Sequence, residues 1–325
     1  MDPVFQWFGG KRMIANEVWK RLGKVTRYIE PFAGSAAVLL ARPEFQGREV
    51  INDLDGYLVN FWRAVKADVE GVAAELVSPI SELDLIARKR VFVREAESLT
   101  ERLKADPKWY DREMAAWWFH GHSASVGNRW LRVNEMPNKF MPAMDTRSIS
   151  DRISDLRAVQ QRLVDVFILC GEWQRALDSE KVTFNGSDTV GIFFDPPYGA
   201  PRTTKIYADD RMDVAADVTR WCLEHGDDKR LRMVVAGYAG EHAELEEAGW
   251  TTHSWMAQGG HGNRRADRSN DNRTKETLWI SPHCQKIEKQ VQMNLWVAVD
   301  NDPSLSEPVD IAENHDLSVQ AASCG

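Results

Sequence analysis

The stretch "TRYIEPFAGSAAVLLARP", Thr26–Pro43, joins a short β-prone run to a glycine turn and an apolar helical run. The segment "REVINDLDGYLVNFWRAVKAD" at 48–68 repeats this order of strand and helix. Strand, helix, strand and helix at this spacing are typical of a parallel, doubly wound sheet. We therefore predict an α/β fold, with strands at Tyr28–Glu30 and Val50–Ile51 and helices at 36–41 and from about Gly56.

This α/β pattern is interrupted by long helical stretches at 81–106 and 148–165, with an aromatic segment at 109–140 between them. Between the two helical stretches we predict one long loop, Gly121–Pro142, and a loop of that length in a compact domain is more often functional than decorative. Alternating elements then return, namely β-prone runs at 166–173, 181–186, 190–194, 231–238, 251–257 and 274–282 and a helix at 212–226. The prediction is one α/β domain, 1–66 and 165–282, that carries an inserted helical domain, 67–164.

Composition narrows the class of protein. The chain has 325 residues, 43% of them hydrophobic and 28% charged, and it contains neither a long apolar run nor a signal-peptide pattern. We therefore expect a globular, cytoplasmic protein without a membrane span. The four cysteines are scattered, with no C-x-x-C pair, so we predict neither a disulfide framework nor a metal site.

The net charge of −8 argues mildly against a nucleic-acid partner, because phosphate binding depends on Lys and Arg. The charge is unevenly distributed, since residues 283–325 hold two lysines and seven acids and so contribute −5. We predict an acidic, partly disordered tail there, with room for a basic surface elsewhere.

The run "IFFDPPYGAP", Ile192–Pro201, carries the strongest chemical signal. An apolar strand leads into Asp195, and Pro196 and Pro197 then prevent the ladder from continuing. Ligands bind beyond the carboxyl ends of parallel strands. A stiff loop there offers a carboxylate, a proline carbonyl and the aromatic face of Tyr198, which suits a flat ligand that forms hydrogen bonds.

Two further features lie upstream of this loop. Gly34 permits a tight turn at a helix N-terminus, although many α/β proteins turn in this way. Asp53, at the end of the next predicted strand, can accept hydrogen bonds from ribose hydroxyls or can cap the following helix. Because the two features occur in sequence, they favour a nucleoside-type cofactor, and the dinucleotide fingerprint G-x-G-x-x-G is absent.

These motifs, in this order, resemble the Dam-like adenine-specific DNA methyltransferases that use S-adenosylmethionine (AdoMet). The resemblance covers about residues 5–282, through "WFGGKR", "EPFAGSAAV", "INDLDGYLVNFW", "DPPY" and "NRTKETLWIS". It implies a Rossmann-like AdoMet-dependent methyltransferase sheet, formed by 1–66 and 165–282, with the inserted helical segment 67–164 as the target-recognition domain.

The resemblance also implies roles for individual residues. It assigns cofactor binding to Trp7, Gly9, Gly10, Lys11, Glu30, Pro31, Phe32, Ala33, Gly34 and Asp53, and catalysis to Asp195, Pro196, Pro197 and Tyr198. Where the family usually has an Asp-Phe pair, whose acid lies near the adenine of the cofactor, this chain has Glu172-Trp173. Glu172 is thus expected near the cofactor, with a side chain one methylene longer.

The mechanism explains the tetrapeptide Asp195–Tyr198. An adenine amino group is a poor nucleophile, because its lone pair is delocalised into the ring. Acceptors at the Asp195 carboxylate and the Pro196 carbonyl would free that lone pair for direct attack on the AdoMet methyl group. The base must first be flipped out of the duplex, and Tyr198 offers a face for it to stack on.

DNA contacts are expected from the insertion and from a second basic segment near residue 270. The candidates are Arg129, Arg132, Asn134, Lys139, Arg264, Arg265 and Arg273, although any one of them can simply be a solvated surface residue. We leave out Trp117, Trp118 and Phe119, because such a run is more often helix core than a stacking platform.

The resemblance implies site-specific methylation of adenine N(6) in duplex DNA, because in the related families Asp rather than Ser before Pro-Pro-Tyr favours adenine. The alternatives are a methyltransferase on cytosine-N(4) or an RNA base, and a DNA-binding relative without turnover. We expect a monomer in a bacterial or phage-infected cell. Whether a cognate restriction nuclease accompanies it is left open.

Overall fold

The computed structural model describes residues 1–5, 7, 9–43, 47–76, 82–124, 148–179, 188–197, 212–255 and 276–287. The chain divides into two units, Met1–Ile287 and Glu288–Gly325, and every described residue belongs to the first. The predicted strand at 181–186 and the predicted disorder of the acidic tail lie outside the described residues.

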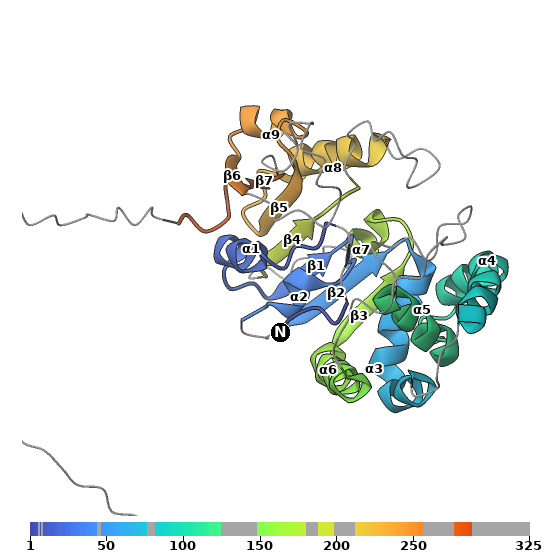
Figure 1. Ribbon diagram of the computed structural model, residues 1–325. Helices are drawn as coiled ribbons and strands as arrows, with labels where there is room; N and C mark the ends of the chain where they lie inside the picture. The colour runs from blue at the N-terminus through green and yellow to red at the C-terminus, as the bar shows by residue number, and fades with distance from the viewer. Residues whose placement is uncertain are drawn as a thin grey trace, which may run out of the picture. The chain divides into compact units, whose positions relative to one another are not determined.

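The first unit contains a seven-stranded sheet of order β3-β2-β1-β4-β5-β7-β6 (Figure 1). Neighbouring strands from β3 to β5 are parallel, whereas β7 runs antiparallel to both β5 and β6. The strands are β1 Arg27–Glu30, β2 Arg48–Asp53, β3 Val166–Cys170, β4 Val190–Phe194, β5 Leu231–Tyr238, β6 Thr251–Trp255 and β7 Glu276–Ile280. The prediction of an α/β fold with a doubly wound sheet is confirmed, and the predicted parallel pairing holds for β1 to β5 but not for β6 and β7.

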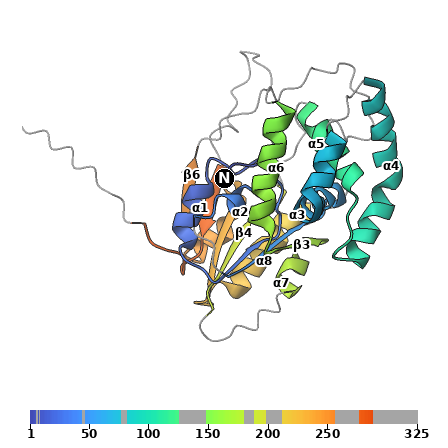
Figure 2. The same ribbon diagram turned by 90° about the horizontal axis from the view of Figure 1, so that it is seen from below.

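Helices cover both faces of this sheet (Figures 1 and 2). They are α1 Ala15–Leu22, α2 Ala37–Leu40, α3 Gly56–Leu76, α4 Glu82–Ala105, α5 Arg112–Ala124, α6 Ile149–Leu163, α7 Gln174–Ser179, α8 Met212–His225 and α9 Ala243–Glu247. Side chains of alternate strand residues enter two separate buried clusters: Tyr28 packs with residues of α1 to α6, and Ile29 with residues of α7 to α9. Alternation of this kind is expected of strands buried on both faces.

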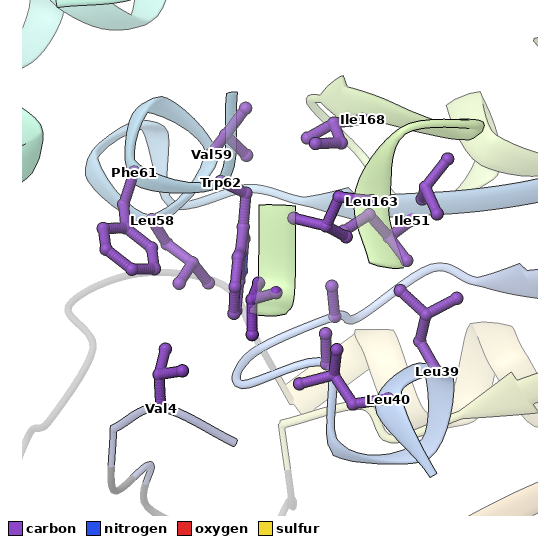
Figure 3. Packing of buried hydrophobic residues seen from close by; sticks show 14 of the residues in the cluster. Val4, Leu39, Leu40, Ile51, Leu58, Val59, Phe61, Trp62, Leu163 and Ile168 are labelled. Atoms are coloured by element: carbon purple, nitrogen blue, oxygen red, sulfur yellow. The ribbon is translucent and has the colours of Figure 1, made fainter. Parts of the chain in front are cut away.

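The larger cluster joins the sheet to the helices of the predicted insertion (Figure 3). Trp62 on α3 and Leu163 on α6 are at most 1% exposed and pack with Ile51 of β2 and Ile168 of β3. Each such side chain contributes about 1.5–3 kcal/mol when fully buried. Helix α6 therefore shares its hydrophobic core with the sheet.

Several local predictions agree with the structure. Helix α1 ends at Gly23, which has a φ of 62°, as predicted for a glycine stop. Trp118 and Phe119 are fully buried, in agreement with their interpretation as helix core. The described cysteines Cys170, Cys222 and Cys284 are buried free thiols.

The loop predicted at Gly121–Pro142 needs a correction at its start. Helix α5 continues through Gly121 to Ala124, so the first four residues of the predicted loop are helical. Gly121 is a buried position, where the small residue is accommodated without ending the helix. Residues 125–147 lie outside the described part of the chain. Among the described helices, none is long and apolar enough to span a membrane.

Candidate active site

The predicted motifs meet at one edge of the sheet. Because β1 to β4 are parallel, the turn after β1, the loops after β2 and β3, and Asp195 after β4 all follow carboxyl ends at this edge. Since β7 is antiparallel, its first residue, Glu276, lies at the same edge and pairs with Tyr238 at the end of β5. The topology therefore adds a carboxylate to the site that the sequence analysis had not selected.

Gly34 shapes the turn after β1. Its φ is +48°, and its N–H donates a hydrogen bond to Asp53 Oδ2 at 2.9 Å. Its carbonyl accepts a hydrogen bond from Trp62 Nε1 at 3.1 Å. A Cβ atom at this position would lie 2.7 Å from Nε1 of Trp7, so only glycine lets the indole of Trp7 lie against the turn.

Asn52 of β2 connects the turn after β1 to the loop after β3. Its side-chain Nδ2 donates to the backbone carbonyls of Pro31 at 3.1 Å and Gly171 at 2.9 Å. Its backbone carbonyl accepts a hydrogen bond from Ala33 N–H at 2.9 Å. Its Oδ1 is buried and has no hydrogen-bond partner among the described residues. Buried acceptors are normally satisfied, so this atom marks a place for a donor from a ligand or water. The pair Asn52-Asp53 at a strand end was the signal for it, but we had selected only Asp53.

The N-terminal motif folds over the turn through Trp7. The Trp7 ring stacks on His122 of α5, with ring centroids 5.5 Å apart, and also contacts Phe5 edge-on at 5.9 Å. Burial lowers the pKa of His122 to about 4, so this imidazole is uncharged at neutral pH. Trp7 also accepts a hydrogen bond at its carbonyl from Gly10 N–H at 3.0 Å. The Trp7–His122 contact thereby fixes the motif to α5, a helix of the predicted recognition domain.

Lys11 lies between two carboxylates. Its Nζ is 3.1 Å from Asp195 Oδ1 and 3.9 Å from Glu276 Oε2, and it donates a hydrogen bond to the Gly9 carbonyl at 2.6 Å. The Lys11 side chain is only 4% exposed. Pro196, the next residue after Asp195, is buried. The structure thus brings the predicted N-terminal motif and the predicted catalytic loop into direct contact.

Glu30 points into the core next to this cluster. Its Oε2 accepts hydrogen bonds from the Tyr28 hydroxyl at 3.0 Å and from Leu39 N–H at 3.1 Å. Complete burial raises the pKa of Glu30 to about 8, and the nearby charge of Asp195 acts in the same direction. At neutral pH the carboxyl of Glu30 is therefore mostly protonated and adds little charge to the site.

We expect Glu30→Gln to remove a pH dependence of stability. A carboxyl with a pKa near 8 when folded and near 4.5 when unfolded keeps its proton only in the folded state, so stability falls as pH rises from about 4.5 to 8. The amide cannot ionise, so the stability of Glu30→Gln relative to the parent should rise by about 3–4 kcal/mol between pH 5 and pH 8. Urea unfolding at both pH values checks this, and parallel pH profiles for the two proteins would contradict it.

Glu172 is exposed and lines a cleft of about 630 Å³ beyond the ends of β2 and β3. Its neighbour Trp173 is 5% exposed and stacks on Phe32 with ring centroids 6.2 Å apart. The bulkier Glu-Trp pair thus places an acid at the cleft and an indole in the core beneath the turn.

The remaining candidates lie outside the described residues. These are Tyr198 of the catalytic loop and the proposed DNA contacts Arg129, Arg132, Asn134, Lys139, Arg264, Arg265 and Arg273. Within the described residues, no cluster of three or more metal-ligating side chains is present.

Comparison with known proteins agrees with this geometry. Residues 7–219 match the family model for D12 class N6 adenine-specific DNA methyltransferases. The chain is 29% identical to the Type II methyltransferase M.MjaIII of Methanocaldococcus jannaschii over 216 residues, which are 61% of this chain and 69% of that protein. It is 35% identical to the Retron Ec67 DNA adenine methylase of Escherichia coli over 72 residues, 22% of this chain and 24% of that protein. The chain belongs to the D12 class of N6 adenine-specific DNA methyltransferases, as its motifs predict.

Proposed function

We propose that this D12 methyltransferase uses AdoMet to methylate N(6) of an adenine that is flipped out of duplex DNA at a specific sequence. The observation that carries the proposal is the position of Asp195. It follows β4 directly, next to the turn after β1, and it contacts Lys11 of the N-terminal motif. A carboxylate there can meet both a base and the methyl donor bound at the turn.

The residues at the sheet edge fit AdoMet. Asp53, which accepts a hydrogen bond from Gly34 N–H, lies where a ribose acceptor is needed. The unsatisfied Asn52 Oδ1 adds a buried acceptor for a polar group. When bound, AdoMet supplies a methyl group activated by its sulfonium charge. The cofactor-binding roles of the other residues of the N-terminal motif and the turn, and that of Glu172, belong to the same proposal.

The chemistry at the base falls to Asp195 and Pro196. The Asp195 carboxylate accepts one hydrogen of the adenine amino group and the Pro196 carbonyl accepts the other, which localises the nitrogen lone pair. The nitrogen would then take the methyl group as the methyl–sulfur bond breaks, and the proton that it loses would pass to the Asp195 carboxylate. Pro197 stiffens the loop, and Tyr198 stacks on the flipped base.

Target recognition is proposed for the helical segment 67–164, with 1–66 and 165–282 as the catalytic part. Arg129, Arg132 and Asn134 would reach base edges, while Lys139, Arg264, Arg265 and Arg273 would contact phosphates. We further propose a cytoplasmic enzyme that acts as a monomer. The type II relative supports action at a defined sequence and makes a cognate nuclease a candidate partner.

The test is transfer of labelled methyl groups from AdoMet to unmodified duplex DNA, followed by digestion to nucleosides. We expect the label in N(6)-methyladenine. Label in N(4)-methylcytosine, or in RNA but not in DNA, would replace this proposal with one of the alternative substrates. Good DNA binding without incorporation of label into any of these substrates would indicate a binding protein.

A further inference from the structure

Glu276 is the acid of the site that has no role in the proposed chemistry. It begins β7, with its backbone paired to Tyr238 on one side and Trp255 on the other. Its side chain is 15% exposed and lies 3.9 Å from the ammonium of Lys11. Because the backbone of Glu276 is paired on both sides and its side chain is mostly buried, its carboxylate has a fixed position relative to Asp195 and Lys11.

Lys11 and the proposed substrate compete for the same acceptor. In the structure, the ammonium of Lys11 lies 3.1 Å from Asp195 Oδ1. An adenine amino group that donates a hydrogen bond to Asp195 would lie at a similar distance from this carboxylate. An ammonium that moves by about 1 Å from its present 3.9 Å would reach hydrogen-bond distance of Glu276 Oε2. Such a movement would keep the lysine paired while it releases Asp195.

We propose that Glu276 is a positioning residue for methyl transfer, which takes the Lys11 ammonium from Asp195 when the adenine amino group binds. This inference rests on the proposed function, because it needs Asp195 as the acceptor of the amino group. Glu276 forms no bond to the substrate and takes part in no covalent step. It acts through Lys11 alone.

The charges of the site support this role. Lys11 has two acids beside it, so when its ammonium pairs with Glu276 the negative charge of Asp195 is no longer compensated, while Glu30 is largely neutral at pH 7. During transfer, positive charge passes from the sulfonium to the amino nitrogen. The Asp195 carboxylate, once Lys11 has moved to Glu276, faces that positive charge and stabilises it.

The test measures methyl transfer to unmodified duplex DNA at pH 8 under saturating AdoMet. We expect Glu276→Gln to lower kcat by about tenfold and to leave the AdoMet Kd within about twofold, because the lost group touches neither ligand. Glu276→Asp keeps the charge and should retain more of the rate than the amide does. Glu247→Gln, which removes an exposed acid on α9, is the matched control and should behave as the parent.

Repeating the substitution in a Lys11→Met background separates positioning from a merely structural role. Without the ammonium there is nothing for Glu276 to hold, so Glu276→Gln should then change the single-turnover rate by less than about twofold. An equal loss in both backgrounds, or an unchanged rate in the parent background, would overturn the proposal.

Two controls keep the result interpretable. Thermal unfolding checks that each variant is folded. If Glu276→Gln does not fold, the single-turnover rate of Glu276→Asp is measured in the parent and in the Lys11→Met background. We then expect a lower rate only in the parent background, where Lys11 is present. Failure of the proposed function looks different, because the parent protein itself would then place no methyl group on adenine.

Discussion

Asp195→Asn is expected to lower the rate of methyl transfer to DNA by on the order of 10³-fold, with the AdoMet Kd changed by less than about threefold. The amide keeps the shape of the carboxylate but removes the charge that faces the amino group and, in the structure, the Lys11 ammonium at 3.1 Å. The proposed AdoMet site is formed by Gly34 of the turn after β1 and by Asn52 and Asp53 at the end of β2, which this substitution leaves in place. Asp195→Ala should have the same effect on the rate.

Strand β4 supplies its own control. Asp188 precedes the strand at the opposite edge of the sheet and pairs with Arg27 at 3.0 Å, so Asp188→Asn removes the same charge far from the site. Single-turnover transfer of labelled methyl and calorimetric titration with AdoMet measure the two quantities. A rate for Asp195→Asn close to that of Asp188→Asn would remove Asp195 from the chemistry.

The strands and turns that build the site were predictable because their signals are local. Apolar β-prone runs end at Glu30, Asp53 and Phe194, and a glycine or proline lies within three residues after the end of each run. Parallel pairing then requires these ends to share one edge. The contact between Lys11 and Asp195 could be expected only from the family resemblance, because nothing local in the sequence joins residues so far apart.

Glu276 was missed for a topological reason. The run "ETLWI" was recognised as a strand, but its direction in the sheet cannot be read from its residues. Only the antiparallel pairing of β7 with β5 places the start of this strand, rather than its end, at the site. A reversed last strand is a property of the assembled sheet.

The position of Glu30 has a signal that was available in the sequence. Residues two apart on a strand share a face, so Glu30 had to lie on the same side as Tyr28, which packs in the larger core cluster. The hydrogen bond between the two side chains follows from that alternation. Cofactor binding by Glu30 stays a prediction, and the nearest contacts of its carboxyl are within the protein.

Glu49→Ala is expected to lower the free energy of unfolding by about 3–5 kcal/mol, the largest stability effect that we predict. Glu49 begins the core of β2 and is fully buried, with Arg42 Nη1 at 2.8 Å and Arg162 Nη1 at 2.6 Å. The alanine variant would leave two guanidinium groups without their carboxylate, and these groups are only 4% and 13% exposed. The cost comes from those stranded charges rather than from the lost contact itself.

An ion pair of similar geometry on the surface serves as the control for the buried Glu49 pairs. Arg157 donates two hydrogen bonds to Glu70, at 2.7 and 2.8 Å, but both side chains are more than half exposed. Glu70→Ala should therefore leave the urea midpoint unchanged, since water replaces the carboxylate. If Glu49→Ala were equally mild, the two arginines would have to reach solvent when Glu49 is absent. Because Arg162 lies on α6, that helix would then have to move away from the edge of β2, and its attachment to the sheet would depend on the apolar core alone.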